Sequence, residues 1–205
     1  MFFRRKIEKK ELVSSKAVKT EFEKDLENLR QLEAQGKITQ ADLDYANALG
    51  LEELALRVSH WRHSQRYQDQ VDFAYFALDE DLDQLVKSEY VGVRMGVAWR
   101  GRDKDLDKLV FDSSPDVRKV VAEQERPQDL DIFMHDLDST VRKTVAKNGS
   151  QKQLEKMVTD SDLGVRYILA YRGNAKVRRQ LLHDEDENVR KYAKECLEFG
   201  GEEKD

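Results

Sequence analysis

The residue types that most often bind metals are few in this chain and do not form a ligand set. The 205 residues include four histidines. His135 and His183 lie 48 residues apart, at the same place in two copies of a 24-residue repeat. At ~10 Å per layer of packed helices they are separated by about 20 Å, too far to share one ion. His60 and His63 are one helical turn apart, but no cysteine follows them. No metal site is predicted.

Catalytic groups are also missing from the sequence. Ser113-Ser114 and Ser14-Ser15 have no histidine in repeat register, and no glycine-rich phosphate loop occurs. The lone Cys196 excludes an internal disulfide and a cysteine-built metal cluster, and it favours a reducing compartment. The sequence therefore predicts a protein without enzyme activity.

The charge balance argues against a general nucleic-acid binder. Lys and Arg total 36 against 41 Asp and Glu, which gives a net charge of −5. Charged residues make up 38% of the chain, and there are only two prolines, which favours a charged, mainly helical protein. No apolar run approaches the ~20 residues of a membrane span, and the N-terminus lacks a secretory core. We expect a cytoplasmic protein.

A Val-Arg pair recurs with a constant step of 24 residues. Its copies are Val93-Arg94, Val117-Arg118, Val141-Arg142, Val165-Arg166 and Val189-Arg190. Aspartates keep the same register, at Asp112, Asp136, Asp160 and Asp184. The arginines could offer a strip to phosphates or acidic peptides. Because the aspartates can pair with them between neighbouring repeats, we predict instead an internal Arg–Asp ladder.

Each repeat contains two apolar segments with helical spacing. Leu130, Phe133 and Met134 follow the i, i+3, i+4 rule of one helical face. Five residues after the repeated Val comes an alanine that predicts close helix contacts, at Ala98, Ala122, Ala146 and Ala170. The residues expected to cap the first helices are Ser114, Asp138, Asp162 and Asp186, with Pro115 as a first helical residue. Helices of about ten and about eight residues are stable only when stacked, as in a solenoid.

The pattern Val-Arg-x-x-Val-Ala, a second apolar cluster, then Asp-x-Asp-x-x-Val-Arg resembles the leucine-rich repeat variant, a 24-residue repeat of the HEAT-like class, over residues 69–195. The resemblance implies an all-α, right-handed solenoid of two-helix repeats and a bacterial source. Ordinary HEAT repeats run to ~40 residues, and a strand-bearing leucine-rich repeat shows an alternation that Leu106-x-x-Leu109-Val110 lacks. Some members of the family carry an iron–sulfur cluster on cysteines before the repeats. This chain has no cysteine there, so no cofactor is predicted.

The segment before the repeats begins with a basic arm. Residues 1–19 hold seven basic and two acidic residues. Helices are predicted from Thr20 to Gly36, from Thr39 to Gly50, and from Leu51 to about His63, the last docking on the first repeat as an N-terminal cap. Residues 26–51 are similar to the two-helix SHOCT motif. The predicted organisation is a basic arm at 1–19, a helical segment at 20–66, a repeat array at 67–198 and an acidic tail at 199–205.

Two exposed positions differ between repeats, at two and six residues after the repeated Val. They hold Lys119/Glu123 and Lys143/Lys147 in the middle but Met95/Trp99 and Tyr167/Tyr171 on either side. Aromatic and Arg groups dominate binding hot spots. The predicted partner-binding residues are therefore Trp99, Arg100, Tyr167, Tyr171 and Arg172. For Trp99, packing under the N-terminal helices is the alternative. The function expected is a protein-binding scaffold, and the alternative is nucleic-acid binding through the basic arm and exposed arginines.

Overall fold

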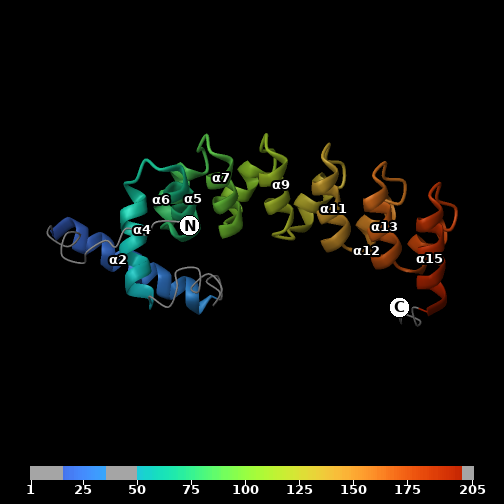
Figure 1. Cartoon of the computed structure of the whole chain (residues 1–205), viewed down its shortest axis with the longest axis horizontal. Coiled ribbons are helices and arrows are strands. Elements are labelled where there is room, and N and C mark those ends of the chain that lie inside the picture. The colour runs from blue at the N-terminus through green and yellow to red at the C-terminus, as the bar shows by residue number, and fades with distance from the viewer. Residues whose placement is uncertain (1–15, 36–49, 200–205) are drawn as a thin grey trace, which may run out of the picture. The chain divides into compact units, whose positions relative to one another are not determined.

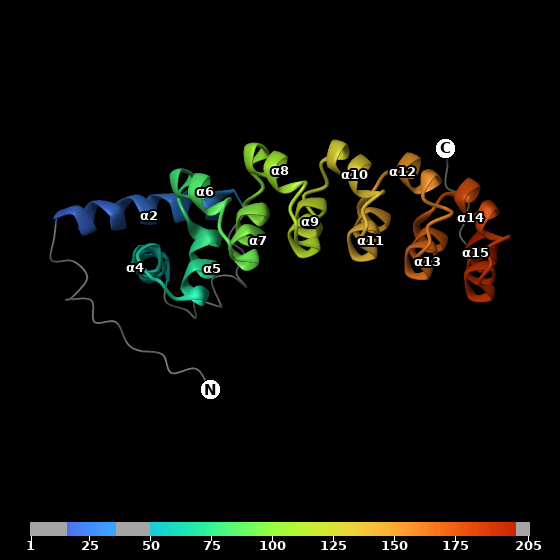
Figure 2. The same ribbon diagram turned by 90° about the horizontal axis from the view of Figure 1, so that it is seen from above.

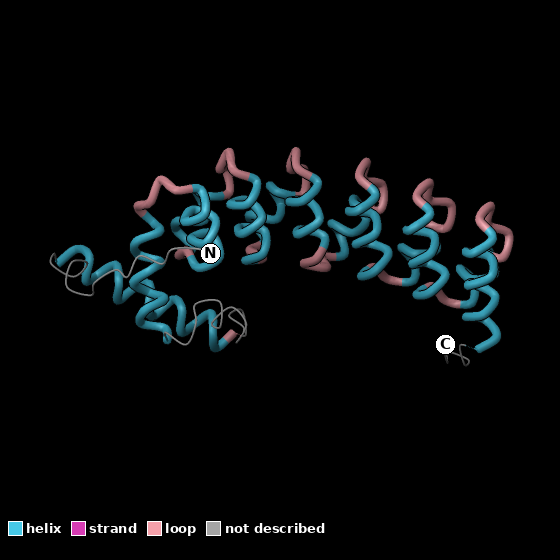
Figure 3. Tube along the Cα trace, in the orientation of Figure 1, coloured by secondary structure: helices cyan, strands magenta, loops and turns pink. Residues whose placement is uncertain are grey.

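A computed structural model describes residues 16–35 and 50–199, and every regular element in these ranges is a helix (Figure 3). The chain divides into two compact units, residues 1–100 and 101–205. The all-α fold class predicted from the repeat is confirmed, whereas the handedness of the solenoid stays a prediction. Most of the basic arm, the helix expected from Thr39, most of the SHOCT-like segment and the acidic tail lie outside the described residues.

The first unit contains five described helices: α2 (Lys16–Ala34), α4 (Gly50–Arg62), α5 (Tyr67–Phe76), α6 (Asp79–Leu85) and α7 (Val91–Arg100) (Figure 1). Helix α2 begins four residues before the expected Thr20. Helix α4 matches the third predicted helix and packs against both α2 and α5. Leu29 of α2 and Leu54 and Val58 of α4 are fully buried in this contact region.

Arg62, at the end of α4, joins three helices of the first unit. Its guanidinium donates to Asp25 of α2 and to Asp81 of α6, and it lies 5.2 Å from the ring centroid of Phe73. The Asp25 side chain is fully buried. A buried carboxylate requires a charged, hydrogen-bonded partner, and Arg62 supplies it.

The second unit is a stack of two-helix layers. Figure 2 shows two rows: a second-helix row of α8 (Asp103–Leu109), α10 (Pro127–Phe133), α12 (Gln151–Lys156) and α14 (Ala175–Leu181), and a first-helix row of α9 (Pro115–Ala122), α11 (Ser139–Asn148), α13 (Leu163–Arg172) and α15 (Glu187–Phe199). Each first helix packs against the first helix of the next layer.

The alanines of the repeat lie where first helices approach one another. Ala122, Ala146 and Ala170 have no exposed surface, and neither do Val121 and Val145 beside them. The inward face predicted from the sequence is therefore correct. Because the side chain of alanine is a single methyl group, the neighbouring helix can pack closely at this position.

The predicted helix caps are correct at three of four positions. Asp138 accepts from the Thr140 amide and Asp162 from the Val165 amide, and Asp186 accepts from the amides of residues 188 and 189. Ser114 was the wrong prediction: its side chain makes no cap hydrogen bond. Pro115 follows it as the first helical residue, as predicted.

The Arg–Asp ladder is internal in the second unit, as predicted. Each of three arginines binds the aspartate 18 residues ahead through Nε and Nη2, in the pairs Arg118–Asp136, Arg142–Asp160 and Arg166–Asp184. The Nη1 group of each donates backwards to the carbonyl of the residue six positions earlier. One guanidinium thus joins a loop of its own layer to a loop of the next, which makes the ladder a structural feature.

A second polar ladder, which the sequence did not reveal, joins the second-helix row. Arg126 donates to Asp103 and forms an ion pair with Asp107 at 2.8 Å. One layer on, Gln153 donates to Asp131 at 3.0 Å, and in the next layer Asn174 donates to Glu155 at 3.1 Å. The donors change from Arg to Gln to Asn, so no residue type repeats. The shared feature is an acid at the same position of α8, α10 and α12, facing a donor from the following layer.

Candidate partner-binding surface

Trp99 is part of an aromatic contact in the first unit. Its ring lies 5.5 Å from that of Tyr75 on the neighbouring helix α5, and 36% of the residue remains exposed. Trp99 therefore packs on a helix of the repeat array and still faces solvent, whereas its packing under the N-terminal helices stays a prediction. Val91 and Met95 precede it along α7 with helical spacing.

Arg100 does not lie on the surface, contrary to expectation. It is only 4% exposed, and its Nη1 donates to the carbonyls of Ala77 and Tyr75 at 2.5 and 3.4 Å. The last carbonyls of a helix have no partner within that helix. Arg100 satisfies such groups at the end of α5, so we exclude it from the candidate surface.

Arg172 makes the equivalent contact three repeats further along the chain. Its Nη1 donates to the carbonyls of Ala146 and Gly149, at the end of α11, at 3.1 and 3.4 Å. The residue is half-buried. Both arginines therefore donate hydrogen bonds to the last carbonyls of the preceding first helix. The main role of Arg172 is to join two layers.

Tyr167 and Tyr171 are exposed as predicted, and a third tyrosine joins them. They lie on α13, 43% and 63% exposed. The ring of Tyr192, on α15, stacks on Tyr167 with centroids 4.7 Å apart and planes 5° apart, and on Tyr171 at 6.4 Å and 19°. Tyr192 was missed because it stands outside the two compared positions. The equivalent positions of the preceding repeats hold Gly96, Val120, Thr144 and Ile168. A large aromatic residue at this position in the last repeat is the sequence feature that could have identified Tyr192.

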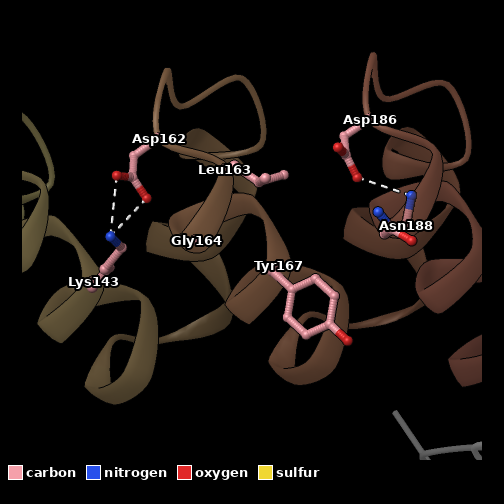
Figure 4. Close-up of a pocket in the computed structure, with 7 residues that line it drawn as sticks. All are labelled: Lys143, Asp162, Leu163, Gly164, Tyr167, Asp186 and Asn188. Atoms are coloured by element: carbon pink, nitrogen blue, oxygen red, sulfur yellow. Dashed lines mark hydrogen bonds and ion pairs between the residues drawn. The ribbon is translucent and has the colours of Figure 1, made fainter.

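Leu163 extends the aromatic pair along α13. It is 47% exposed and precedes Tyr167 by four residues, as Tyr167 precedes Tyr171. Residues at this spacing lie on one helical face. We call Leu163, Tyr167, Tyr171 and Tyr192 the tyrosine surface. Beside it is an open groove of about 540 Å³, lined by Lys143, Asp162, Leu163, Gly164, Tyr167, Asp186 and Asn188 (Figure 4).

The carboxylates of Asp162 and Asp186 at this groove already have hydrogen-bond partners within the fold. The Lys143 ammonium lies 2.9 and 3.1 Å from the two oxygens of Asp162, one of which also caps α13. Burial alone raises the pKa of Asp162, but hydrogen bonds from Lys143, Ser139 and the Val165 amide outweigh it and lower that pKa to about 2. Asp186 caps α15 in the same way. Both carboxylates are therefore held in place by hydrogen bonds within the fold.

The same face is mostly polar in the two preceding layers. On α9 the equivalent positions hold Pro115, Lys119 and Glu123, the last two forming an exposed pair at 3.7 Å. On α11 they hold Ser139, Lys143 and Lys147. Layers with polar residues here stack as well as the layer of α13, so stacking does not require the apolar residues of the tyrosine surface.

Within residues 16–35 and 50–199 no group of three or more His, Cys, Asp or Glu side chains is arranged to hold a metal ion. Among the helices of the same ranges, none combines the length and apolarity that crossing a bilayer requires.

No protein-family model matches the chain, and the search of curated proteins returned no match. Among solved structures, a leucine-rich repeat variant with a novel repetitive structural motif matches with a TM-score of 0.61 and 28% sequence identity. The match covers 74% of this chain and 68% of that one. The resemblance based on the 24-residue pattern is confirmed by this match, whereas the SHOCT-like resemblance stays a prediction.

Proposed function

We propose that this chain, a helical repeat protein that resembles the leucine-rich repeat variant, is a non-enzymatic cytoplasmic scaffold that binds another protein through its tyrosine surface. The observation that carries the proposal is the contrast along the first-helix row. Leu163, Tyr167 and Tyr171 are exposed on α13, whereas the equivalent positions of α11 are polar. Clustered apolar side chains in water mark an interaction site when the fold does not need them.

The composition of the surface suits a protein partner. Tyrosine offers a large apolar ring with a hydroxyl group, and it is enriched among residues that dominate binding energy. The stacking of Tyr192 on Tyr167 and Tyr171 restricts the motion of these rings before binding. This restriction lowers the conformational entropy lost on association. Burial raises the pKa of the Tyr192 hydroxyl, and nearby Cys196 adds to the effect.

The proposal is tested with the double variant Leu163→Ala/Tyr171→Ala. Both residues are about half exposed or more, so each substitution should change the free energy of unfolding by about 0.5 kcal/mol or less. Loss of a hot spot worth about 2 kcal/mol weakens partner binding roughly 30-fold. Arg172 is left unchanged because it caps α11.

The partner is first identified by affinity purification of the tagged chain from its own cells and mass spectrometry, and its affinity for purified variants is then measured. The control is Glu123→Ala/Lys147→Ala, at the two positions equivalent to Tyr171 in the layers of α9 and α11. We expect the control to retain the partner. Full retention by the Leu163/Tyr171 variant, or a large drop in its melting temperature, would show that the tyrosine surface is not the binding site.

A further inference from the structure

The second-helix row of the second unit changes its charge along the stack. Helix α8 carries three aspartates and two lysines, and α10 carries two aspartates and no basic residue. Helix α12 carries two lysines and one glutamate, and α14 carries one lysine, two arginines and no acid. The last two helices of this row are therefore basic on a chain whose net charge is −5.

Four exposed side chains form this basic patch: Lys152 and Lys156 on α12, and Lys176 and Arg179 on α14. Lys152 and Lys156 are four residues apart and share a helical face. In the described part of the chain, neither they nor Arg179 has a hydrogen-bond or ion-pair partner. Three full positive charges therefore face solvent on two neighbouring helices that are in contact.

The one carboxylate on α12 and α14, that of Glu155, already has a positively charged partner. Glu155 lies 2.6 Å from the Lys176 ammonium and accepts from Asn174 at 3.1 Å. The hydrogen bond from Lys176 is the main reason why the pKa of Glu155 is below its ordinary value. Glu155 therefore remains an anion engaged by the following layer and leaves Lys152, Lys156 and Arg179 uncompensated.

Arg179 reverses the charge of its repeat position. The same position holds Asp107, Asp131 and Glu155 in the preceding layers, and each of these acids binds a donor from the next layer. The second polar ladder explains those acids. It does not explain Arg179, whose charge is opposite and which binds no group in the described residues. A ligand outside the fold would account for it.

We propose that the basic patch binds a short acidic segment of a partner protein, at a site separate from the tyrosine surface. Opposite charges within a Debye length, about 8 Å at physiological salt, attract a segment that lies directly on the patch. A nucleic acid also extends beyond the patch, where the acidic remainder of the chain repels its phosphates. A short acidic segment avoids that repulsion, which is why we favour it.

The test uses a fluorescein-labelled peptide of eight glutamates flanked by Gly-Ser, titrated with the full chain and followed by fluorescence anisotropy. The test variant is Lys152→Glu/Lys156→Glu/Arg179→Glu. The matched control, Lys119→Glu/Lys147→Glu/Lys191→Glu, makes the same change in net charge on the first-helix row. We expect the test variant to lose at least tenfold in affinity and the control to stay within about twofold of the wild-type chain.

Raising NaCl from 50 to 300 mM should weaken peptide binding by the wild-type chain, because the charges are exposed. Leu163→Ala/Tyr171→Ala should keep its affinity for the peptide, which separates this site from the tyrosine surface. The proposal is overturned if the wild-type chain does not bind the peptide, or if both charge-reversal variants lose affinity equally. Tighter binding of an oligothymidylate of equal charge would overturn the proposal in favour of nucleic acid as the ligand of the patch. Salt-sensitive self-association that the test variant lacks would overturn it in favour of a second copy of this chain.

Discussion

Arg142 and Asp160 face each other across the boundary between two layers, joined by parallel hydrogen bonds of 2.7 Å from Nε and 2.9 Å from Nη2. Their side chains are almost entirely withdrawn from solvent. The Asp160 carboxylate also accepts from the amide of residue 162. This pair therefore fixes a loop and a helix of adjacent layers in one arrangement.

Replacing Asp160 by Ala should destabilise the chain by about 2 to 4 kcal/mol, because the largely buried Arg142 cation then loses its hydrogen-bonded counter-charge. The measurement is urea-induced unfolding at pH 7. The comparison variant is Glu123→Ala, which removes the exposed pair with Lys119 and should cost about 0.5 kcal/mol or less. Equal losses from the two substitutions would mean that the ladder does not stabilise the stack.

The alanine contact predicts a steric effect. Ala146→Leu adds three carbon atoms where the native methyl group is fully buried, and such overpacking typically costs about 1 to 3 kcal/mol. Ala175→Leu makes the same change at an exposed residue near the start of α14. Thermal unfolding should separate the two variants by several degrees. A neutral Ala146→Leu would show that the first helices do not approach closely there.

Gly173 ends α13 at a place where a side chain does not fit. A Cβ atom there would overlap the Leu169 carbonyl oxygen and the Val177 side chain. Gly173→Ala should therefore cost about 1 to 3 kcal/mol. At Gly164 the nearest atom is the flexible end of Lys143, which can shift at the expense of its contact with Asp162, so Gly164→Ala should change stability by about 1 kcal/mol or less. Chemical denaturation measures both, and an opposite order would contradict the packing at Gly173.

The Asp162–Lys143 pair predicts a contribution to acid stability. The pKa of Asp162 is about 2 in the folded chain, below the ordinary value of about 3.9 in an unfolded chain. A lowered pKa stabilises the fold above the unfolded value, and this contribution is lost as the pH falls from about 4 to about 2. Solvent screening reduces the gain to about 1 kcal/mol.

Asp162→Asn tests this contribution, because asparagine is also a good N-cap but carries no charge. Unfolding by urea between pH 7 and pH 2 should show a smaller loss of stability in the variant than in the wild-type chain. Parallel pH dependences for the two proteins would show that the charge of Asp162 does not contribute.

The repeated elements of the fold could be predicted because their chemistry recurs. Arg118, Arg142 and Arg166 each meet an aspartate at the same offset, so a single pattern identified both the layers and the ladder. The second polar ladder could not be found in this way, because Arg126, Gln153 and Asn174 perform one role with three different side chains. Only the positions of the donors in space reveal the shared function.

The candidate site was harder to predict than the fold. Tyr167 and Tyr171 followed from comparing equivalent positions, but Tyr192 lies at a different position and joins them only through stacking between helices. Arg100 was misplaced because a guanidinium next to an exposed tryptophan can also turn inward to unpaired carbonyls. A repeat position identifies a helical face, whereas the direction of a long side chain depends on the end of the neighbouring helix.

The constant offset of the Arg–Asp ladder has a consequence for how the number of layers can change. Excision of residues 139–162 removes Arg142 and Asp160 together and leaves Arg118–Asp136 and Arg166–Asp184 as pairs. The Nη1 group of Arg166 then meets the carbonyl of Asp136, which stands where that of Asp160 stood. A recombination event of one period therefore preserves the Arg–Asp pairing at the new seam, so the ladder itself needs no compensating substitution when the array gains or loses a layer.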